Sequence, residues 1–332
     1  MTAMLLLGLT ALAIAAPLGC ALAKSLGLWD LPNVARKTQR EPALLAGGLV
    51  LGLVLVLVHL LAAPFGVDLG SVPANPVDFL IGPSPVGAGP GAGLDPLVRL
   101  LGAWPAATAL GLALLVGLVD DWLPKGLGPG AKALGQVLAA VPLLAIAPGI
   151  WGVLWMLTAV ASMNIVNTFD HADRVTPGFG VLATAAWCPP VALGLAGFTL
   201  LNRTRTKEQR WPSIYLGDGG SHLLGMLLVL IPGGLVFLLV PALDLTRVVL
   251  QRLAVGQSPF HGDRRHVGQV LADAGWSRDA AWSAVTLLSL PAFVFWVSLG
   301  TLPLAGGLAV YSLASVGYFL LLRSVGGLRF GR

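Results

Sequence analysis

Long apolar runs recur from one end of the chain to the other and constrain its fold more than any other feature. About 20 residues of helix are needed to cross the hydrocarbon core of a bilayer, so each run of that length predicts a membrane-spanning helix. Hydrophobic residues make up 56% of the 332 residues and charged residues only 11%, outside the range of soluble domains. We therefore predict an all-α, polytopic integral membrane protein. The runs lie near 2–23, 43–64, 99–119, 131–148, 150–168, 178–201, 215–253, 280–299 and 302–322.

These runs leave no room for a soluble domain of ordinary size. We expect one integral membrane domain over 1–332, with about 9–11 transmembrane helices. The run at 2–23 lacks a basic start and a clear cleavage site, which favours a retained span over a removed signal peptide. Cys20 and Cys188 lie in apolar runs without metal-ligand spacing, so the cysteines indicate neither a disulfide framework nor a metal site.

Basic residues indicate which side of the membrane each connection occupies. The net charge of +5 and the pI of 9.6 could suggest nucleic acid binding, but the bases are split among short segments beside the spans. Cytoplasmic loops carry an excess of Lys and Arg, which explains these bases without a nucleic-acid partner. The Gly- and Pro-rich loop 65–98 has no base and is expected on the opposite side.

The middle of the chain does not fit a simple alternation of crossings. The basic segment 202–210 should be cytoplasmic, yet only about 23 apolar residues separate it from a polar segment near 170 that is predicted on the same side. A hairpin that turns at Pro189 and Pro190 would keep both segments inside, with arms too short to cross fully. The same conflict recurs at 231–234, so we predict two hairpins with short or tilted arms.

Polar clusters lie at the ends of these spans that are predicted to be cytoplasmic. A carboxylate at membrane depth is costly unless it faces a polar cavity or a partner, so each cluster is a candidate functional site. The clusters are VDDW at 119–122, NIVNTFDHAD at 164–173, YLGDGGS at 215–221 and SPFHGDRRH at 258–266.

The clusters combine hard oxygen ligands with cations. Carboxylates without a thiolate suit Mg²⁺ or Mn²⁺, and clustered Arg and Lys suit phosphate. Carboxylates, a divalent ion and bases together are typical of phosphoryl transfer, where charge neutralisation and positioning provide most of the catalysis. The candidate oxygen ligands are Asp120, Asp121, Asp170, Asp173 and Asp218, and the candidate cations are Lys125, Lys132, Arg264, Arg265 and His266.

Each cluster taken alone has a purely structural explanation. Paired Asp residues at a helix end are often a solvated terminus, and Asn at three-residue spacing can hydrogen-bond between membrane helices. Arg264 and Arg265 could be a positive-inside anchor. The prediction that all the clusters share one face favours a common site over independent structural roles.

The order of these motifs resembles the polyprenyl-phosphate N-acetylhexosamine-1-phosphate transferases, integral membrane enzymes of glycosyltransferase family 4 type that load a sugar 1-phosphate onto a lipid carrier. LWDLPNVARKTQREPALLAGG (28–48) is similar to a family loop, and GLVDDW with Lys132 and Gln136 fits its Asp-Asp motif. NIVNTFDHAD fits N-x-x-N-x-x-D-x-x-D, and YLGDGGS fits G-D-x-G-S. SPFHGDRRH is similar to the P-F-x-x-D-R-x-H loop of the branch that uses donors like UDP-GlcNAc.

The resemblance implies transfer of a sugar 1-phosphate from a UDP-sugar to a polyprenyl (undecaprenyl) phosphate, with release of UMP, in cell-envelope synthesis. It implies an Mg²⁺-dependent enzyme in the bacterial plasma membrane with a cytoplasmic site. Asp120 would be the base or the partner of the lipid phosphate, and Asp218 and Asp121 would hold the metal. Asn164, Asn167, Asp170 and Asp173 would shape the nucleotide-sugar pocket, Lys132 would contact phosphate, and His261, Arg264, Arg265 and His266 would clamp the sugar diphosphate.

Several positions depart from the family pattern. His171 and Arg174 stand where the family usually has glycines, which permit close backbone approach. Other departures are Gln39, Leu44, Leu45, Gly268 and Gln269. These changes leave every acidic residue in place, but they motivate a second hypothesis, a catalytically silent relative that binds a polyprenyl lipid as a scaffold.

A third hypothesis is a transporter that uses buried carboxylates for ion coupling. Its acids would be expected near the bilayer midplane, whereas here they gather at one end of the spans. The sequence does not determine the oligomeric state, and a homodimer is one option.

Overall fold

The computed structural model describes residues 2–32, 41–62, 104–146, 149–170, 174–185, 188–203, 213–231, 234–259, 264–291, 293–294 and 304–326. Helices provide almost all of the regular structure within these ranges. They are α1 (Thr2–Ser25), α2 (Gly47–Ala62), α5 (Trp104–Trp122), α6 (Pro129–Ala140), η3 (Val141–Ala145), α7 (Ile150–Phe169), α8 (Val175–Ala185), α9 (Pro189–Leu201), α10 (Gly217–Leu230), η4 (Gly234–Leu238), α11 (Leu239–Ala254), α12 (Val267–Asp273), α13 (Arg278–Leu287) and α15 (Leu304–Ser324).

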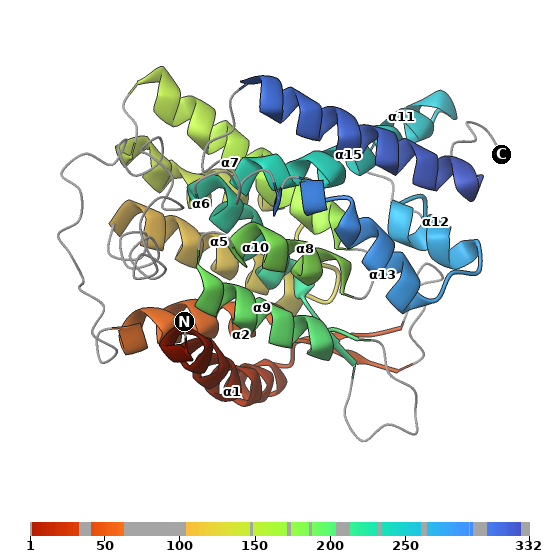
Figure 1. Ribbon diagram of the computed structural model, residues 1–332. Coiled ribbons are helices and arrows are strands. Elements are labelled where there is room, and N and C mark those ends of the chain that lie inside the picture. Colours follow the sequence, from red (N-terminus) through yellow and green to blue (C-terminus); the bar gives the residue numbers. More distant parts are fainter. Residues whose placement is uncertain are drawn as a thin grey trace.

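Helix α10 lies at the centre of the molecule (Figure 1). It packs against α2, α5 and α7, and every residue from Gly219 to Leu230 is buried. On one side α1, α2 and α9 pack against one another, and on the other α11 packs against α7 and α15. The sequence of α10 is apolar all round apart from its first residues, a pattern that suits either the interior of a helix bundle or contact with lipid, and here α10 occupies the interior.

Four of the described helices are long and apolar enough to cross a membrane, namely Thr2–Ser25, Trp104–Trp122, Ile150–Phe169 and Gly234–Ala254. Shorter apolar helices, such as Val175–Ala185 and Pro189–Leu201, accompany them. The protein is therefore an all-α polytopic membrane protein, as predicted. The larger number of 9–11 transmembrane helices stays a prediction.

Exposed tryptophans mark both ends of α5. The side chains of Trp104 and Trp122 are 67% and 62% exposed. A helix rises about 1.5 Å per residue, so they lie about 27 Å apart along the axis, close to the thickness of a bilayer core. Tryptophan is enriched at membrane–water interfaces. Asp120 and Asp121 directly precede Trp122, which favours an interfacial position for them over the midplane position that the transporter hypothesis expects.

The first predicted hairpin is confirmed. Helices α8 and α9 pack against each other, and α9 begins at Pro189, whose fixed φ and missing N–H suit the first turn of a helix. The second break also lies where it was predicted, between Leu230 and Gly234. The return arm differs, however, because only the short η4 packs back on α10, and α11 packs mainly against α7 and α15.

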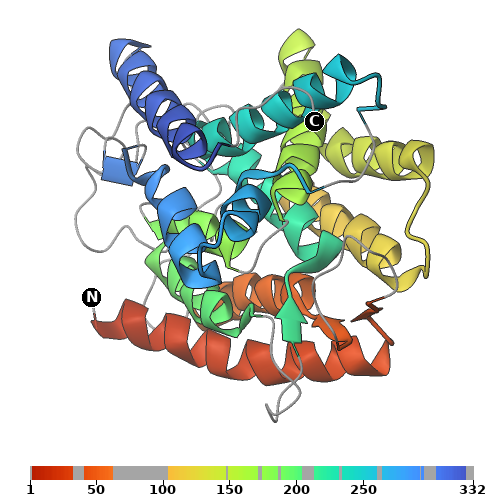
Figure 2. The same cartoon turned by 90° about the vertical axis from the view of Figure 1, so that its right-hand side faces the viewer.

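A small sheet of order β1–β2–β3 lies outside the prediction. Strands β1 (Trp29–Asp30) and β2 (Ala43–Leu45) are antiparallel, and β2 and β3 (Ser213–Tyr215) are parallel, with Leu44 opposite Ile214. In Figure 1 the strands lie toward the lower right, Figure 2 is viewed from that side, and β2 packs against α1. The sheet joins the segment after α1 to the segment that enters α10.

Glycines allow the helices around α10 to approach closely. A Cβ at Gly117 on α5 would lie 2.3 Å from the carbonyl oxygen of Asp218, and a Cβ at Gly225 on α10 would lie 2.7 Å from the Cα of Met163 on α7. Such distances are shorter than any ordinary contact. Glycine at these two positions therefore allows α5 to approach the start of α10 and α10 to approach α7.

The Gly117→Ala variant should be destabilised, because the new methyl group meets backbone rather than a flexible side chain. Overpacking of this kind costs about 1–3 kcal/mol. The matched control is Gly111→Ala on the same helix, where a Cβ would meet nothing within 4 Å. There, alanine should stabilise the helix by about 0.5–1 kcal/mol. Thermal unfolding in detergent, followed by tryptophan fluorescence, measures both effects, and equal midpoints for the two variants would contradict the proposed close packing.

Candidate active site

Helix ends of opposite polarity meet at one place. The carboxyl ends of α5 and α7 lie beside the amino ends of α6 and α10, as the contacts among Asp120, Lys132, Asn167 and Asp218 show. Asp120, Asn167 and Asp218 come from three of the four polar clusters that the sequence singled out, and Lys132 was predicted as a separate cation. The structure therefore confirms that VDDW, NIVNTFDHAD and YLGDGGS reach a common face.

The ammonium group of Lys132 is the centre of this cluster. Its Nζ donates to Asp218 Oδ2, and it lies 3.4 Å from Asp120 Oδ2 and 3.4 Å from Asn167 Oδ1. Asn167 Nδ2 in turn donates to Ser221 Oγ over 3.0 Å. One cation thus balances two carboxylates, which would otherwise repel each other in a partly buried site.

Asp121 has a different role from its neighbour Asp120. Its Oδ1 accepts the backbone N–H of Asp218 and its Oδ2 that of Gly219, each over 2.9 Å. The first N–H groups of a helix have no partner within the helix, and the helix dipole favours a negative charge there. Asp121 therefore caps the amino end of α10 from another helix. Gly217, with φ 73°, provides the left-handed turn at which α10 begins.

Asp120 Oδ1 accepts the backbone N–H of Leu127 over 2.7 Å. This bond closes the turn between α5 and α6, in which Gly126 has φ 66°. The turn brings Lys132, in the first turns of α6, back over the end of α5. Asp120 consequently contacts the cation with one oxygen and orders the loop with the other.

A second row of polar side chains lies behind the cluster. Asn164 was predicted as a site residue, Gln136 was named only as part of the family motif, and His222 was not predicted. Asn164 Nδ2 donates to Gln136 Oε1 over 2.7 Å, and Gln136 Nε2 lies 2.8 Å from His222 Nε2. His222 Nδ1 lies 2.6 Å from the carbonyl oxygen of Asp218 and must donate to it. His222 Nε2 then accepts from Gln136. A histidine in an otherwise apolar helix, directly after YLGDGGS, was the signal available in the sequence.

The described contacts of the SPFHGDRRH loop (258–266) are with residues outside the Lys132 cluster. His266 Nδ1 lies 2.7 Å from Asp244 Oδ2, Arg264 pairs with Asp273 at 2.6 Å, and the carbonyl oxygen of Arg265 accepts from Arg247. One apolar cluster nevertheless includes a residue at the end of α7 and a residue at the start of α12, directly after this loop. It contains Phe169, which precedes Asp170, and Val267, which follows His266. Asp173 and His261 lie outside the described residues.

Arg174, one of the two departures from the family pattern, has φ 68°. This left-handed conformation favours glycine, which explains why glycine is usual at that position. The Arg174 N–H donates to Asn202 Oδ1 over 2.6 Å, and its guanidinium pairs with Asp279 on α13. The side chain is thus held against α13. His171, the other departure, lies outside the described residues.

The oxygens around Lys132 are the kind that Mg²⁺ prefers. Among the described residues, no three His, Cys, Asp or Glu side chains are grouped so that they could hold a metal ion by themselves. Mg²⁺ is, however, usually bound by one or two carboxylates together with substrate phosphates. Within the described residues, each oxygen of Asp121 accepts one backbone N–H and retains acceptor capacity. The donor set therefore fits Mg²⁺ that binds jointly with a diphosphate.

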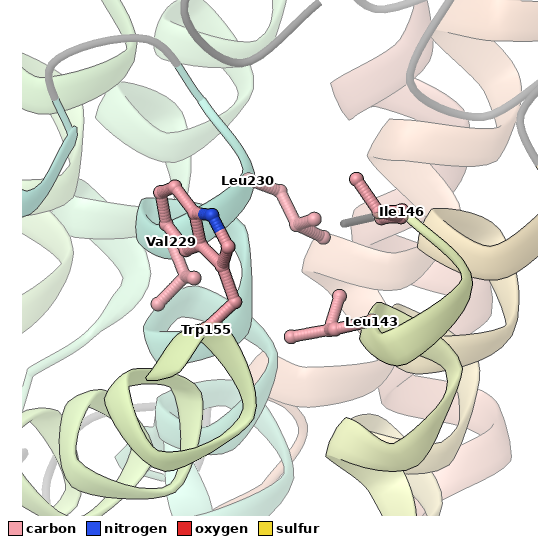
Figure 3. A pocket seen from close by; sticks show the side chains of 5 residues that line it. All are labelled: Leu143, Ile146, Trp155, Val229 and Leu230. Carbon is pink, nitrogen blue, oxygen red and sulfur yellow. The ribbon is translucent and has the colours of Figure 1, made fainter. Parts of the chain in front are cut away.

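A small apolar pocket lies at the opposite end of the same helices (Figure 3). The side chains of Leu143, Ile146, Trp155, Val229 and Leu230 line it, from η3 and the turn after it, α7 and α10. None of these side chains is charged, and the Trp155 indole N–H is the one polar group among them. The pocket is a packing gap between diverging helices and is distinct from the polar cluster.

Comparison with known proteins finds no matching family model but does find curated relatives. The chain is 25% identical over 224 residues to the undecaprenyl-phosphate alpha-N-acetylglucosaminyl 1-phosphate transferase of Yersinia pestis (53% of this chain, 60% of the relative). It is 26% identical over 240 residues to the decaprenyl-phosphate N-acetylglucosaminephosphotransferase of Mycolicibacterium smegmatis (52% and 57%). It is 26% identical over 170 residues to the undecaprenyl-phosphate alpha-N-acetylglucosaminyl 1-phosphate transferase of Escherichia coli K12 (46% of this chain, 43% of the relative).

The chain thus spans about half the length of the curated relatives that it matches. These similarities agree with the resemblance carried by the motifs.

If Lys132 is the shared cation, the effects of Lys132→Gln and Asp218→Asn on stability should not add. Each single variant breaks the ion pair, and the double variant loses little more than the worse single one. We expect a coupling free energy of unfolding of about 0.5–3 kcal/mol, as for residues in one ion-pair network. The control, Lys125→Gln, removes an exposed charge and should change stability by less than about 0.5 kcal/mol. Strict additivity in chemical denaturation would refute the pairing.

Proposed function

We propose that this protein transfers a sugar 1-phosphate, N-acetylhexosamine 1-phosphate, from a UDP-sugar to a polyprenyl phosphate such as undecaprenyl phosphate, and releases UMP. The observation that carries the proposal is the position of Lys132 between Asp120, Asp218 and Asn167, where four helix ends meet. The similarity to curated transferases supports it independently of this geometry.

The proposed reaction makes and breaks bonds to phosphorus. An oxygen of the lipid phosphate attacks the phosphorus that carries the sugar, and the bond from that phosphorus to the UMP oxygen breaks. Charge accumulates on the phosphoryl oxygens, so positioned cations supply most of the catalysis. Lys132 would contact these oxygens. Asp120 would orient the lipid phosphate or accept its proton, because its Oδ2 is the oxygen that faces Lys132.

Mg²⁺ is the cofactor that this donor set fits best. Asp218 and Asp121 would hold it beside the diphosphate, where it would neutralise phosphate charge. Asn164, Asn167, Asp170 and Asp173 would shape the nucleotide-sugar pocket. The loop with His261, Arg264, Arg265 and His266 would clamp the sugar diphosphate from the far side.

The membrane setting suits a reaction between a water-soluble and a lipid substrate. Asp120 and Asp121 lie next to an interfacial tryptophan, so a polyprenyl phosphate could present its head group while its chain stays in the bilayer. Basic residues near the same ends support a cytoplasmic location for this face in a bacterial cell, where a UDP-sugar would reach it. A homodimer stays a prediction.

The direct experiment incubates purified protein in lipid with undecaprenyl phosphate, Mg²⁺ and labelled UDP-N-acetylhexosamines. We expect a labelled lipid product, and a loss of at least about 100-fold for Asp120→Asn and for Asp218→Asn, because each removes a charge from the reacting site. Asp68→Asn, in the loop that the sequence places on the opposite side, is the matched control and should keep full turnover. Undiminished turnover in both site variants would reject the site. Lipid and nucleotide binding without product, across a broad panel of donors, would favour the scaffold hypothesis.

Removal of the metal provides a separate prediction. Excess EDTA should abolish product formation, and Mg²⁺ added above the chelator concentration should restore it, with Mn²⁺ as a second effective ion because both prefer hard oxygen ligands. The amount of UMP released is measured as the readout of turnover. Full activity in EDTA would show that the reaction needs no divalent ion, and the proposed roles of Asp218 and Asp121 as metal ligands would be wrong.

A further inference from the structure

A second charged network lies on α11, separate from Lys132. Its centre is Asp244, a carboxylate with 0% exposure. Asp244 Oδ1 accepts from Arg247 Nη2 over 2.9 Å, from the Val267 N–H over 3.0 Å and from the Tyr318 hydroxyl over 2.7 Å. Its Oδ2 lies 2.7 Å from His266 Nδ1. A buried charge without partners is strongly destabilising, but here a cation, a hydroxyl, a backbone amide and an imidazole all approach it.

The network connects segments that are distant in the sequence. Arg247 Nε donates to the Tyr318 oxygen over 2.7 Å, and Arg247 Nη1 donates to Gln251 Oε1 over 2.9 Å. Arg247 Nη2 also donates to the carbonyl oxygen of Arg265. Helix α15, which carries Tyr318, and the loop that carries His266 are therefore held on one face of α11. An apolar cluster that contains Val240, Val267 and Tyr318 encloses the same contacts.

The geometry determines the form of the His266 ring. An ionised carboxylate can only accept, so Nδ1 must carry the proton that is shared with Asp244. A carboxylate that accepts from one ring nitrogen fixes both the orientation of a histidine and the tautomer it adopts. Asp244 itself has little freedom, because Arg247 and Tyr318 hold its other oxygen. The orientation of His266 is thus determined by residues of α11 and α15.

We propose that Asp244 is a positioning residue that acts through His266, and that Tyr318 on α15 helps to hold Asp244 in place. The inference rests on the proposed function, in which His266 contacts the sugar diphosphate. Asp244 does not touch the substrate, because its side chain is 1% exposed and surrounded by protein groups. It holds the His266 imidazole in one orientation. The next residue, Val267, belongs to the same apolar cluster as Phe169 at the end of α7.

Kinetics of four proteins test the inference: wild type, Asp244→Asn, His266→Gln and the double variant. Asp244→Asn should lower kcat by about 10–100-fold, the range for residues that orient a reacting group. Its KM for the UDP-sugar should change far less. The double variant should be no worse than His266→Gln alone, because Asp244 acts only through that ring. A further loss of tenfold or more in the double variant would show that Asp244 supports the fold instead.

Tyr318→Phe removes one of the three donors to Asp244 Oδ1 and should give a smaller loss of kcat. This variant remains informative if Asp244→Asn does not fold.

Nitrogen-15 spectra of histidine-labelled protein provide a readout that does not depend on turnover. The chain has 5 histidines, and His266→Gln assigns the signal of this residue. We expect the Nδ1-protonated form in the wild type, and a shift of the His266 signal alone in Asp244→Asn. An unchanged signal would overturn the inference. If the wild type forms no lipid product while the spectra behave as expected, the proposed function fails and the Asp244–His266 pairing stands.

Discussion

The two N–H bonds from the start of α10 to Asp121 are the interaction on which the rest of the arrangement depends. Neighbouring helices enclose α10, so the amino end of this helix has little access to water and needs an acceptor from the protein. Asp121 supplies that acceptor and fixes the end of α5 against α10, at the point where Gly117 permits close contact. Asp120 is then placed beside Lys132. The two adjacent residues therefore have different roles, because Asp121 joins α5 to α10 and Asp120 contacts Lys132.

The two charged networks differ in how accessible they are. Lys132, Asp120 and Asp218 have side chains that are 19%, 15% and 25% exposed, so a ligand can reach them. Asp244 is 1% exposed and Arg247 is 4% exposed, so they can act only on protein groups. The first network suits the exchange of partners during a reaction. The second suits a fixed support, because each of its bonds would be costly to leave unmade.

The sequence predicted the parts of this protein that depend on local pattern. Apolar length indicated the helices, Pro189 indicated the turn before α9, and the cost of a carboxylate near a membrane pointed to Asp120 and Asp218. The strands were missed because two or three residues carry no periodicity. The cap by Asp121, the row through Gln136 and His222, and the support of His266 by Asp244 depend on contacts between helices far apart in sequence. Residue type and spacing alone do not reveal such contacts.

Arg174 has a consequence for how such a chain can change over time. The left-handed backbone costs a residue with a side chain about 1–2 kcal/mol relative to glycine. The ion pair with the exposed carboxylate of Asp279 stabilises the folded state by about 0–1 kcal/mol, so it partly offsets the backbone cost. An arginine at this position is therefore tolerated best when an acid already stands opposite on α13. The two positions are therefore coupled, because the residue at either one changes how well the residue at the other is tolerated.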